Sequence, residues 1–137
     1  MADDSLELIE VPKFETKRLI LKQISLQDIP SYEKHFVDYD VIRTLSRLVP
    51  WPYPKGGIKE HILTTVLPLN GKVRWAWGIF LKSNESELIG TVDLWLEGKP
   101  ENRGFWIGRE HWGKGLMTEA VVPVNDFAFN VLCMKQL

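Results

Sequence analysis

Apolar and polar residues alternate along the middle of the chain, which is the pattern of β-strands that bury one face. The alternation is strictest over residues 73–82 and continues over 88–97 and 103–109. Residues 98–102, GKPEN, are typical of a turn between the last two strands. An earlier segment, 14–24, is rich in long apolar and β-branched residues and predicts a first strand.

Helical spacing of apolar residues predicts three helices around these strands. Ser25 and Asp28 form a capping pair for a helix that runs to about residue 36. A second helix is expected over 58–68, and a third begins near Gly113 and contains Pro123, which should kink it. The predicted order is strand, two helices, three strands and a helix, in a single α/β (α+β) domain over residues 1–137.

Composition and charge exclude several classes of protein. The chain has 137 residues, 17 Lys and Arg against 18 Asp and Glu, and no cluster of basic residues, so nucleic acid is not an expected partner. A single cysteine rules out an internal disulfide, and three widely spaced histidines do not suggest a metal site. The acidic start is not a signal peptide, and the apolar stretch 75–81 is too short to cross a bilayer, so we expect a cytoplasmic domain without membrane contact.

The segment that carries chemistry is 104–120, GFWIGREHWGKGLMTEA, in which a predicted strand leads through a glycine-containing turn into a helix. Gly113 and Gly115 let the backbone approach a ligand closely. The free N–H groups and the dipole at the start of the helix favour phosphate oxygens, especially those of a diphosphate. A tight connection whose glycines serve packing remains the alternative.

Residues 108–115 also match seven of the eight positions of the nucleotide-binding pattern G-x-x-x-x-G-K-[ST]. The eighth position is Gly115, which lacks the hydroxyl that would hold Mg²⁺. Three consecutive strands of antiparallel type do not suggest a parallel NTPase sheet either. A P-loop NTPase is therefore the less favoured alternative.

The same segment resembles motif A of the GNAT N-acetyltransferases, R/Q-x-x-G-x-G/A, and in particular the branch that includes the ribosomal-protein-alanine acetyltransferases. The similarity lies in FWIG, WGKGL and TEA of this segment and in ETKRLILKQ near the N-terminus. It implies the GNAT acyl-CoA N-acyltransferase fold, a mixed and mostly antiparallel sheet flanked by helices. It also implies acetyl-CoA as cosubstrate, no metal, and acetyl transfer to a primary amine of a protein N-terminus or a small molecule.

The resemblance also implies where acetyl-CoA would lie. Its pyrophosphate would rest on the turn amides, and its pantetheine arm would pair with the preceding strand. The turn positions are Trp112, Gly113, Lys114, Gly115, Leu116 and Met117, and the strand positions are Phe105, Trp106 and Ile107. Two positions depart from the pattern: Trp112 stands at the Arg/Gln position and Met117 at the Gly/Ala position.

In the family, the domain continues beyond this helix with a strand, a helix and a strand, whereas this sequence ends at Leu137. The resemblance therefore implies a C-terminally truncated fold whose uncovered edge favours self-association. A non-catalytic acyl-CoA-binding or scaffold protein is the alternative to an enzyme.

Candidate groups for the reaction are less sharply indicated. If residues 98–102 form the turn, the register places Asp93 opposite Ile107, beside the reacting end of the pantetheine, as a general base. Glu97 lies further away on the same face, and a solvated role for Asp93 is the alternative. Trp51 and Tyr53, in the proline-rich loop 50–54, are candidates for acceptor binding, with a role in packing as the alternative.

Overall fold

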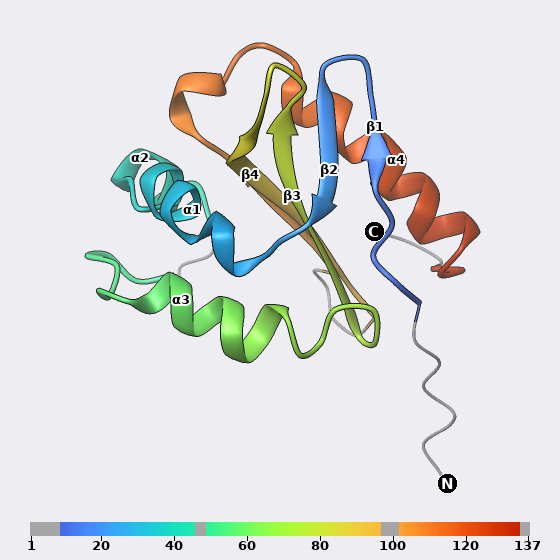
Figure 1. Ribbon diagram of the computed structural model, residues 1–137, viewed down its shortest axis with the longest axis horizontal. Helices are drawn as coiled ribbons and strands as arrows, with labels where there is room; N and C mark the ends of the chain where they lie inside the picture. The colour runs from blue at the N-terminus through green and yellow to red at the C-terminus, as the bar shows by residue number, and fades with distance from the viewer. Residues whose placement is uncertain (1–8, 46–48, 97–101, 135–137) are drawn as a thin grey trace, which may run out of the picture.

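The computed structural model describes residues 9–45, 49–96 and 102–134 (Figure 1). Five strands form one sheet in the order of the chain, and each neighbouring pair is antiparallel. The strands are β1 (Phe14–Glu15), β2 (Leu19–Gln23), β3 (Arg74–Leu81), β4 (Asn84–Trp95) and β5 (Arg103–Ile107). Residues 97–101, which include Glu97 and most of the predicted turn, lie outside the described ranges.

Helices cover both faces of the sheet, as Figure 1 shows. One face packs against the long C-terminal helix, and the other packs against helices that connect β2 to β3. The helical elements are η2 (Leu26–Asp28), α1 (Ile29–Phe36), α2 (Tyr39–Ile42), α3 (Gly57–His61), its π-helical continuation η3 (Ile62–Val66), η4 (Arg109–His111) and α4 (Leu116–Asn130). None of the helices in the described residues is both long and apolar enough to cross a bilayer. The expected α/β fold of an antiparallel sheet flanked by helices is confirmed.

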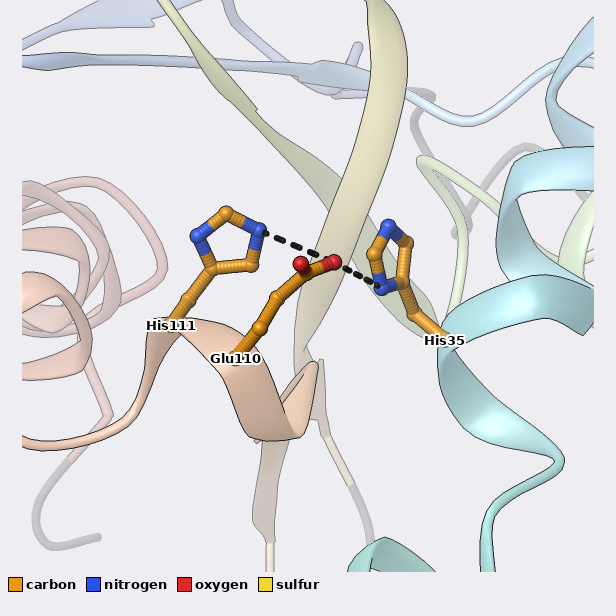
Figure 2. Close-up of side chains that lie close together, drawn as sticks. All are labelled: His35, Glu110 and His111. Atoms are coloured by element: carbon orange, nitrogen blue, oxygen red, sulfur yellow. Dashed lines mark ion pairs between the residues drawn. The ribbon is translucent and has the colours of Figure 1, made fainter.

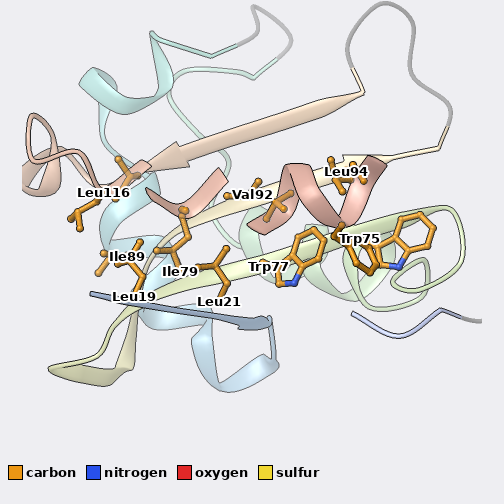
Figure 3. Packing of buried hydrophobic residues seen from close by; sticks show 14 residues of the cluster. Leu19, Leu21, Trp75, Trp77, Ile79, Ile89, Val92, Leu94 and Leu116 are labelled. Carbon is orange, nitrogen blue, oxygen red and sulfur yellow. The ribbon is translucent and has the colours of Figure 1, made fainter. Parts of the chain in front are cut away.

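The core between the sheet and α4 is built from the alternating side chains of the strands (Figure 3). Trp75 and Trp77 of β3 are fully buried there, as their alternation predicts. Their indole N–H groups donate to the backbone carbonyls of Ile9 and Pro12, both at 2.7 Å. These two bonds hold the segment before β1 against the sheet.

The opposite core is formed by the other face of the sheet with α1, α2 and α3. Tyr32 and Phe36 of α1 pack there against Trp106 of β5, with ring centroids 5.2 and 5.0 Å apart. Because these helices cover this face, Arg74, which alternates with the apolar residues of β3, is buried. Arg74 therefore places a charged group on this face, at one end of the candidate active site.

Local details differ from the sequence prediction in three places. The expected strand 14–24 is a hairpin, because the chain turns at residues 16–18 and β1 folds back on β2. The short helix α2 was not predicted. A β-bulge near Ile89 shifts the β3–β4 register, so Leu88 faces Phe80 on the opposite face from Val92, although spacing predicted one shared face.

The β4–β5 register also differs from the prediction, and this affects the site. Asp93 lies opposite Gly104, and Ile107 lies opposite Gly90, so the predicted pairing of Asp93 with Ile107 is wrong. The main-chain N–H of Trp95 already bonds to the carbonyl of Asn102, so the ladder begins within the segment expected to be turn. The partner of Asp93 is thus three residues away from the predicted one, Gly104 instead of Ile107. Because three is an odd number, Asp93 and Ile107 lie on opposite faces of the sheet.

Candidate active site

The turn between β5 and α4 presents unpaired backbone N–H groups to a small cavity. Gly113 and Gly115 have φ angles of 75° and 76°, in the left-handed region that glycine adopts without strain. Gly115 is the N-cap of α4 and has no side chain that could cap the helix. The first N–H groups of α4 therefore have no side-chain acceptor at this position. The cavity beside them, of about 230 Å³, is lined by Trp112, Gly113, Gly115, Leu116 and Met117, with Ile107, His111 and Thr118. This geometry suits an anion.

Arg18, which directly precedes β2, holds this turn in place. Its Nη1 donates to the carbonyl of Lys114 at 3.0 Å, and its Nε donates to Glu119 Oε1 at 2.8 Å. Glu119 also accepts hydrogen bonds from the backbone N–H of Arg18 and the hydroxyl of Thr16. Burial raises the pKa of Glu119, but these hydrogen bonds and the charge of Arg18 outweigh it and bring the pKa to about 2. The carboxylate therefore stays ionised and ties α4 to the hairpin.

The outer edge of β5 leads away from the turn. The carbonyl of Asn102 and the N–H of Gly108 bond to β4. The main-chain groups of residues 103, 105 and 107 therefore point away from β4, toward the outer edge of the sheet. Within the described ranges, no strand pairs with that edge. Ile107 accepts a 2.8 Å hydrogen bond there from the indole N–H of Trp112. A cavity of about 280 Å³ along this edge is lined by Phe105, Trp106, Ile107, Trp112 and Met117, with Val41 and Thr44.

A larger cavity, of about 740 Å³, lies at the far end of β5. Aromatic side chains form much of its wall: Tyr32, Phe36, Tyr53, Trp95, Phe105 and Trp106. Charged groups occupy one part of it, where Arg74 Nη2 lies 2.7 Å from Asp93 Oδ2. The guanidinium of Arg74 also stacks over Trp95, 4.2 Å from the ring centroid. The cavity therefore joins a buried ion pair to an apolar lining.

Burial shifts the titration of the polar groups in this cavity. It raises the pKa of Asp93 above its ordinary value, although the charge and hydrogen bond of Arg74 oppose the shift. It lowers the pKa of His61, and the charge of Arg74 lowers it further. Burial therefore makes the Asp93 carboxylate more basic than that of an exposed aspartate and makes the His61 imidazole harder to protonate.

The three cavities share lining residues and form one path. Ile107, Trp112 and Met117 line both the turn cavity and the edge cavity, and Thr44, Phe105 and Trp106 line both the edge cavity and the large one. The path runs from the start of α4, along the outer edge of β5, to Asp93. We call it the β5 trough.

The proline-rich loop contributes only one of its two candidates to this trough. Tyr53 is half-buried, lines the large cavity and packs edge-on against Phe36, with ring centroids 5.4 Å apart. Trp51 is 47% exposed and packs against Tyr39 instead, outside the lining of the cavities described here. The structure therefore brings Tyr53, but not Trp51, to the trough.

Sequence reasoning missed several residues of the large cavity, chiefly Arg74, His61 and Tyr32. Arg74 carried a usable signal, because a basic residue on β3 and an acidic one on β4 share the face opposite Trp75 and Trp77. His61 and Tyr32 carried none, since their helices reach this face only through the tertiary fold. Two histidines judged too scattered for a cluster, His35 and His111, lie with ring centroids 5.7 Å apart.

Comparison with known proteins agrees with the fold. Residues 18–137 match the model of the acetyltransferase (GNAT) domain. The chain is 26% identical over 125 residues to the uncharacterized N-acetyltransferase p20 of Bacillus licheniformis, covering 89% of this chain and 68% of that protein. It is 30% identical over 129 residues to the uncharacterized N-acetyltransferase YoaA of Bacillus subtilis, covering 92% of this chain and 71% of that protein.

Among solved structures, an acetyltransferase from Agrobacterium tumefaciens superposes with a TM-score of 0.70 at 23% identity, covering 92% of this chain and 71% of that one. This likeness shows the fold, and the match to the domain model shows the family. The chain belongs to the GNAT acetyltransferase family. Its relatives are longer, since the matches cover about seven tenths of each.

Proposed function

We propose that this protein binds acetyl-CoA in the β5 trough and transfers the acetyl group to a primary amine held in the large cavity. The observation that carries the proposal is the path itself, which joins a glycine turn at a helix start to the Asp93 carboxylate. Membership of the acetyltransferase family supports acyl transfer as the reaction class.

The turn fits the diphosphate of acetyl-CoA. A Cβ built on Gly113 would meet no atom within 4 Å, and one on Gly115 would meet only the Arg18 guanidinium, at 3.6 Å, so the surface there is open. The N–H groups of Leu116 and Met117 at the start of α4 would donate to phosphate oxygens. Lys114, which is exposed, adds a positive charge beside them.

The outer edge of β5 fits the pantetheine arm. Amide groups of an extended arm would pair with the main chain of Phe105 and Ile107 as a further strand would. The Ile107 carbonyl retains a second lone pair beside its bond to Trp112. Trp106 lies between them with its side chain in the opposite core, and its main-chain groups face β4 and not the arm.

In the reaction, the amine nitrogen attacks the thioester carbonyl carbon, the new C–N bond forms, and the C–S bond breaks to release the CoA thiolate. The attacking nitrogen must lose a proton, and Asp93, directly or through one water, is the acceptor we assign. Its raised pKa improves it as a base, and Arg74 fixes the orientation of its carboxylate. Tyr53 and the other aromatic walls would hold the apolar part of the acceptor.

A direct test measures acetyl-CoA binding by calorimetry and release of free CoA in the presence of a panel of amines. Binding together with amine-dependent CoA release supports the proposal. Binding without release for every amine favours the non-catalytic acyl-CoA-binding alternative. A preference for ATP–Mg²⁺ would favour an NTPase, which the antiparallel pairing of the strands already disfavours.

A further inference from the structure

A second cluster of titratable side chains lies at η4, directly before the glycine turn. His35 at the end of α1 and Glu110 and His111 of η4 point toward one another (Figure 2). Glu110 Oε1 lies 3.6 Å from His35 Nδ1 and 3.9 Å from His111 Nε2. One ligand atom from each residue falls within 4.8 Å of the other two. Two elements that are distant in sequence therefore bring two nitrogens and one carboxylate oxygen together.

A fourth residue, Glu87 of β4, orients the buried histidine. Its Oε2 lies 2.6 Å from His35 Nε2, so this carboxylate accepts the Nε2–H and leaves the Nδ1 side of the ring directed at Glu110. Lys34 also donates to Glu87, at 3.1 Å, and holds the carboxylate in place. A histidine whose second nitrogen donates to a carboxylate is the usual arrangement of metal-bound imidazoles.

The gap between His35 and Glu110 is not closed by a hydrogen bond. The distance of 3.6 Å from Nδ1 to Oε1 exceeds the range for N–H···O bonds. In the tautomer whose Nε2–H donates to Glu87, the lone pair of His35 Nδ1 faces the carboxylate oxygen of Glu110, and the two repel each other. A cation shared between these atoms removes that repulsion.

The spacing suits a tetrahedral transition-metal ion. Zinc binds imidazole nitrogen and carboxylate oxygen at about 2.0–2.2 Å, so neighbouring ligand atoms lie about 3.3 Å apart in a tetrahedral site. Both Glu110 distances, 3.6 and 3.9 Å, are near this spacing, and the ligand atoms of all three residues lie within 4.8 Å of one another, so binding would draw them inward. The Glu110 side chain, 64% exposed, is free to move. The His35 ring packs closely against Gly108, since a Cβ added to that glycine would come within 2.7 Å of Nδ1.

We propose that His35, Glu110 and His111 bind one divalent transition-metal ion, with Zn²⁺ as the best match to two imidazoles and one carboxylate. Glu87 serves as the positioning residue for His35. Three protein ligands leave a fourth position for water. Because His111 directly precedes the turn at 112–117, the bound ion would link that turn to α1 and stabilise it, in addition to the contacts of Arg18.

The test uses the untagged chain with Cys133→Ser, which removes the exposed thiol as a competing ligand. After chelator treatment, Zn²⁺ binding is measured by calorimetry, and Co²⁺ is added separately to read tetrahedral coordination from its visible absorption. We expect one ion per chain and an intense Co²⁺ band. His111→Gln and Glu110→Gln, which alter partly exposed side chains, should each weaken binding about tenfold or more.

His61→Gln is the matched control, because it removes the third histidine of the chain, which lies in the large cavity instead. It should leave Zn²⁺ affinity and the Co²⁺ spectrum unchanged. Circular dichroism on each variant confirms that it is folded. No saturable binding by the folded protein, or equal weakening by His61→Gln and His111→Gln, would overturn the proposal and leave the cluster as a set of ion pairs.

Discussion

Arg74 Nη2 and Asp93 Oδ2 meet at 2.7 Å across β3 and β4, and the arginine that makes this contact is only 2% exposed. Asp93 sits opposite Ala76 on β3, so Arg74 reaches it diagonally from two positions along the strand. The pair lies on the sheet face covered by α1 and α3, where it supplies the charged part of an otherwise aromatic cavity.

Replacing Asp93 with Asn should remove the proposed base. We expect kcat for amine acetylation to fall about 100-fold or more, with little change in the KM for acetyl-CoA. Asp93 must be ionised to act, so its raised pKa places the acidic limb of the wild-type pH–rate profile above the ordinary range of aspartate, and the variant should lose that limb. Asp126→Asn, on the exposed side of α4, is the control. An unchanged kcat in Asp93→Asn would show that another group takes the proton.

The same substitution should also reduce stability, because it leaves the Arg74 charge buried without its counter-ion. Breaking a fully buried pair costs about 3–5 kcal/mol, and we expect a loss toward the lower end of that range because Asp93 is partly accessible from the cavity. Urea unfolding of Asp93→Asn, Arg74→Met and the double variant measures the coupling. Strictly additive losses would show that the ion pair contributes nothing to stability.

Acetyl-CoA should stabilise the folded protein. At one hundred times its dissociation constant, a ligand that binds only the native state adds about 2.7 kcal/mol by mass action. Thermal unfolding with acetyl-CoA, with ATP–Mg²⁺ and with buffer alone measures this. Equal shifts for the two nucleotides would contradict the assignment of the β5 trough to acetyl-CoA.

Gly115→Val should weaken CoA binding at least tenfold, which corresponds to about 1.4 kcal/mol, because its branched Cβ crowds the amides at the start of α4. Gly56→Val is a matched control. Gly56 is also an exposed helix N-cap, with a φ of 78°, so the substitution introduces comparable backbone strain away from the trough. Lys114→Ala should have a smaller effect, since salt screens an exposed charge. Comparable CoA affinity in the two glycine variants would exclude the turn as the phosphate site.

Glu119 should make stability depend on pH below about 4.5. Its pKa is about 2 in the folded protein and near 4.5 when unfolded, so the unfolded state takes up a proton first as the pH falls. Its contribution is therefore complete above pH 4.5 and is lost progressively as the pH falls toward 2. Melting at several pH values should show a shallower loss in Glu119→Gln, which is already destabilised at pH 7 by about 1–2 kcal/mol. Glu33→Gln, exposed on α1, should melt like the wild type.

Self-association is expected through the outer edge of β5. Within the described ranges that edge pairs with no strand, and Phe105 beside it is 44% exposed. Light scattering over a range of concentrations should show dimers or larger species, and Phe105→Lys should reduce them. Leu63→Lys, at an equally exposed apolar residue of η3, is the control. A monomer at every concentration would contradict the expectation.

Much of the fold follows from local patterns in the sequence. Alternation over 73–82 predicts β3 and its buried tryptophans, Ser25 with Asp28 predicts the start of the first helix, and the residues of 104–120 predict the strand, turn and helix of the trough. These features depend on neighbours within a few positions, through side-chain periodicity, capping and the conformational freedom of glycine.

What only the tertiary structure decided concerns contacts between distant segments. The β4–β5 register determines which residues of β5 share a face with Asp93, and a shift by an odd number of residues reverses that relation without changing the composition of either strand. The bulge near Ile89 likewise puts Leu88 and Val92 on opposite faces. Burial of Arg74 and the meeting of His35 with His111 depend on where α1 and α3 pack. Sequence spacing carries no information on such meetings, because they are set by the packing of whole elements against both faces of the sheet.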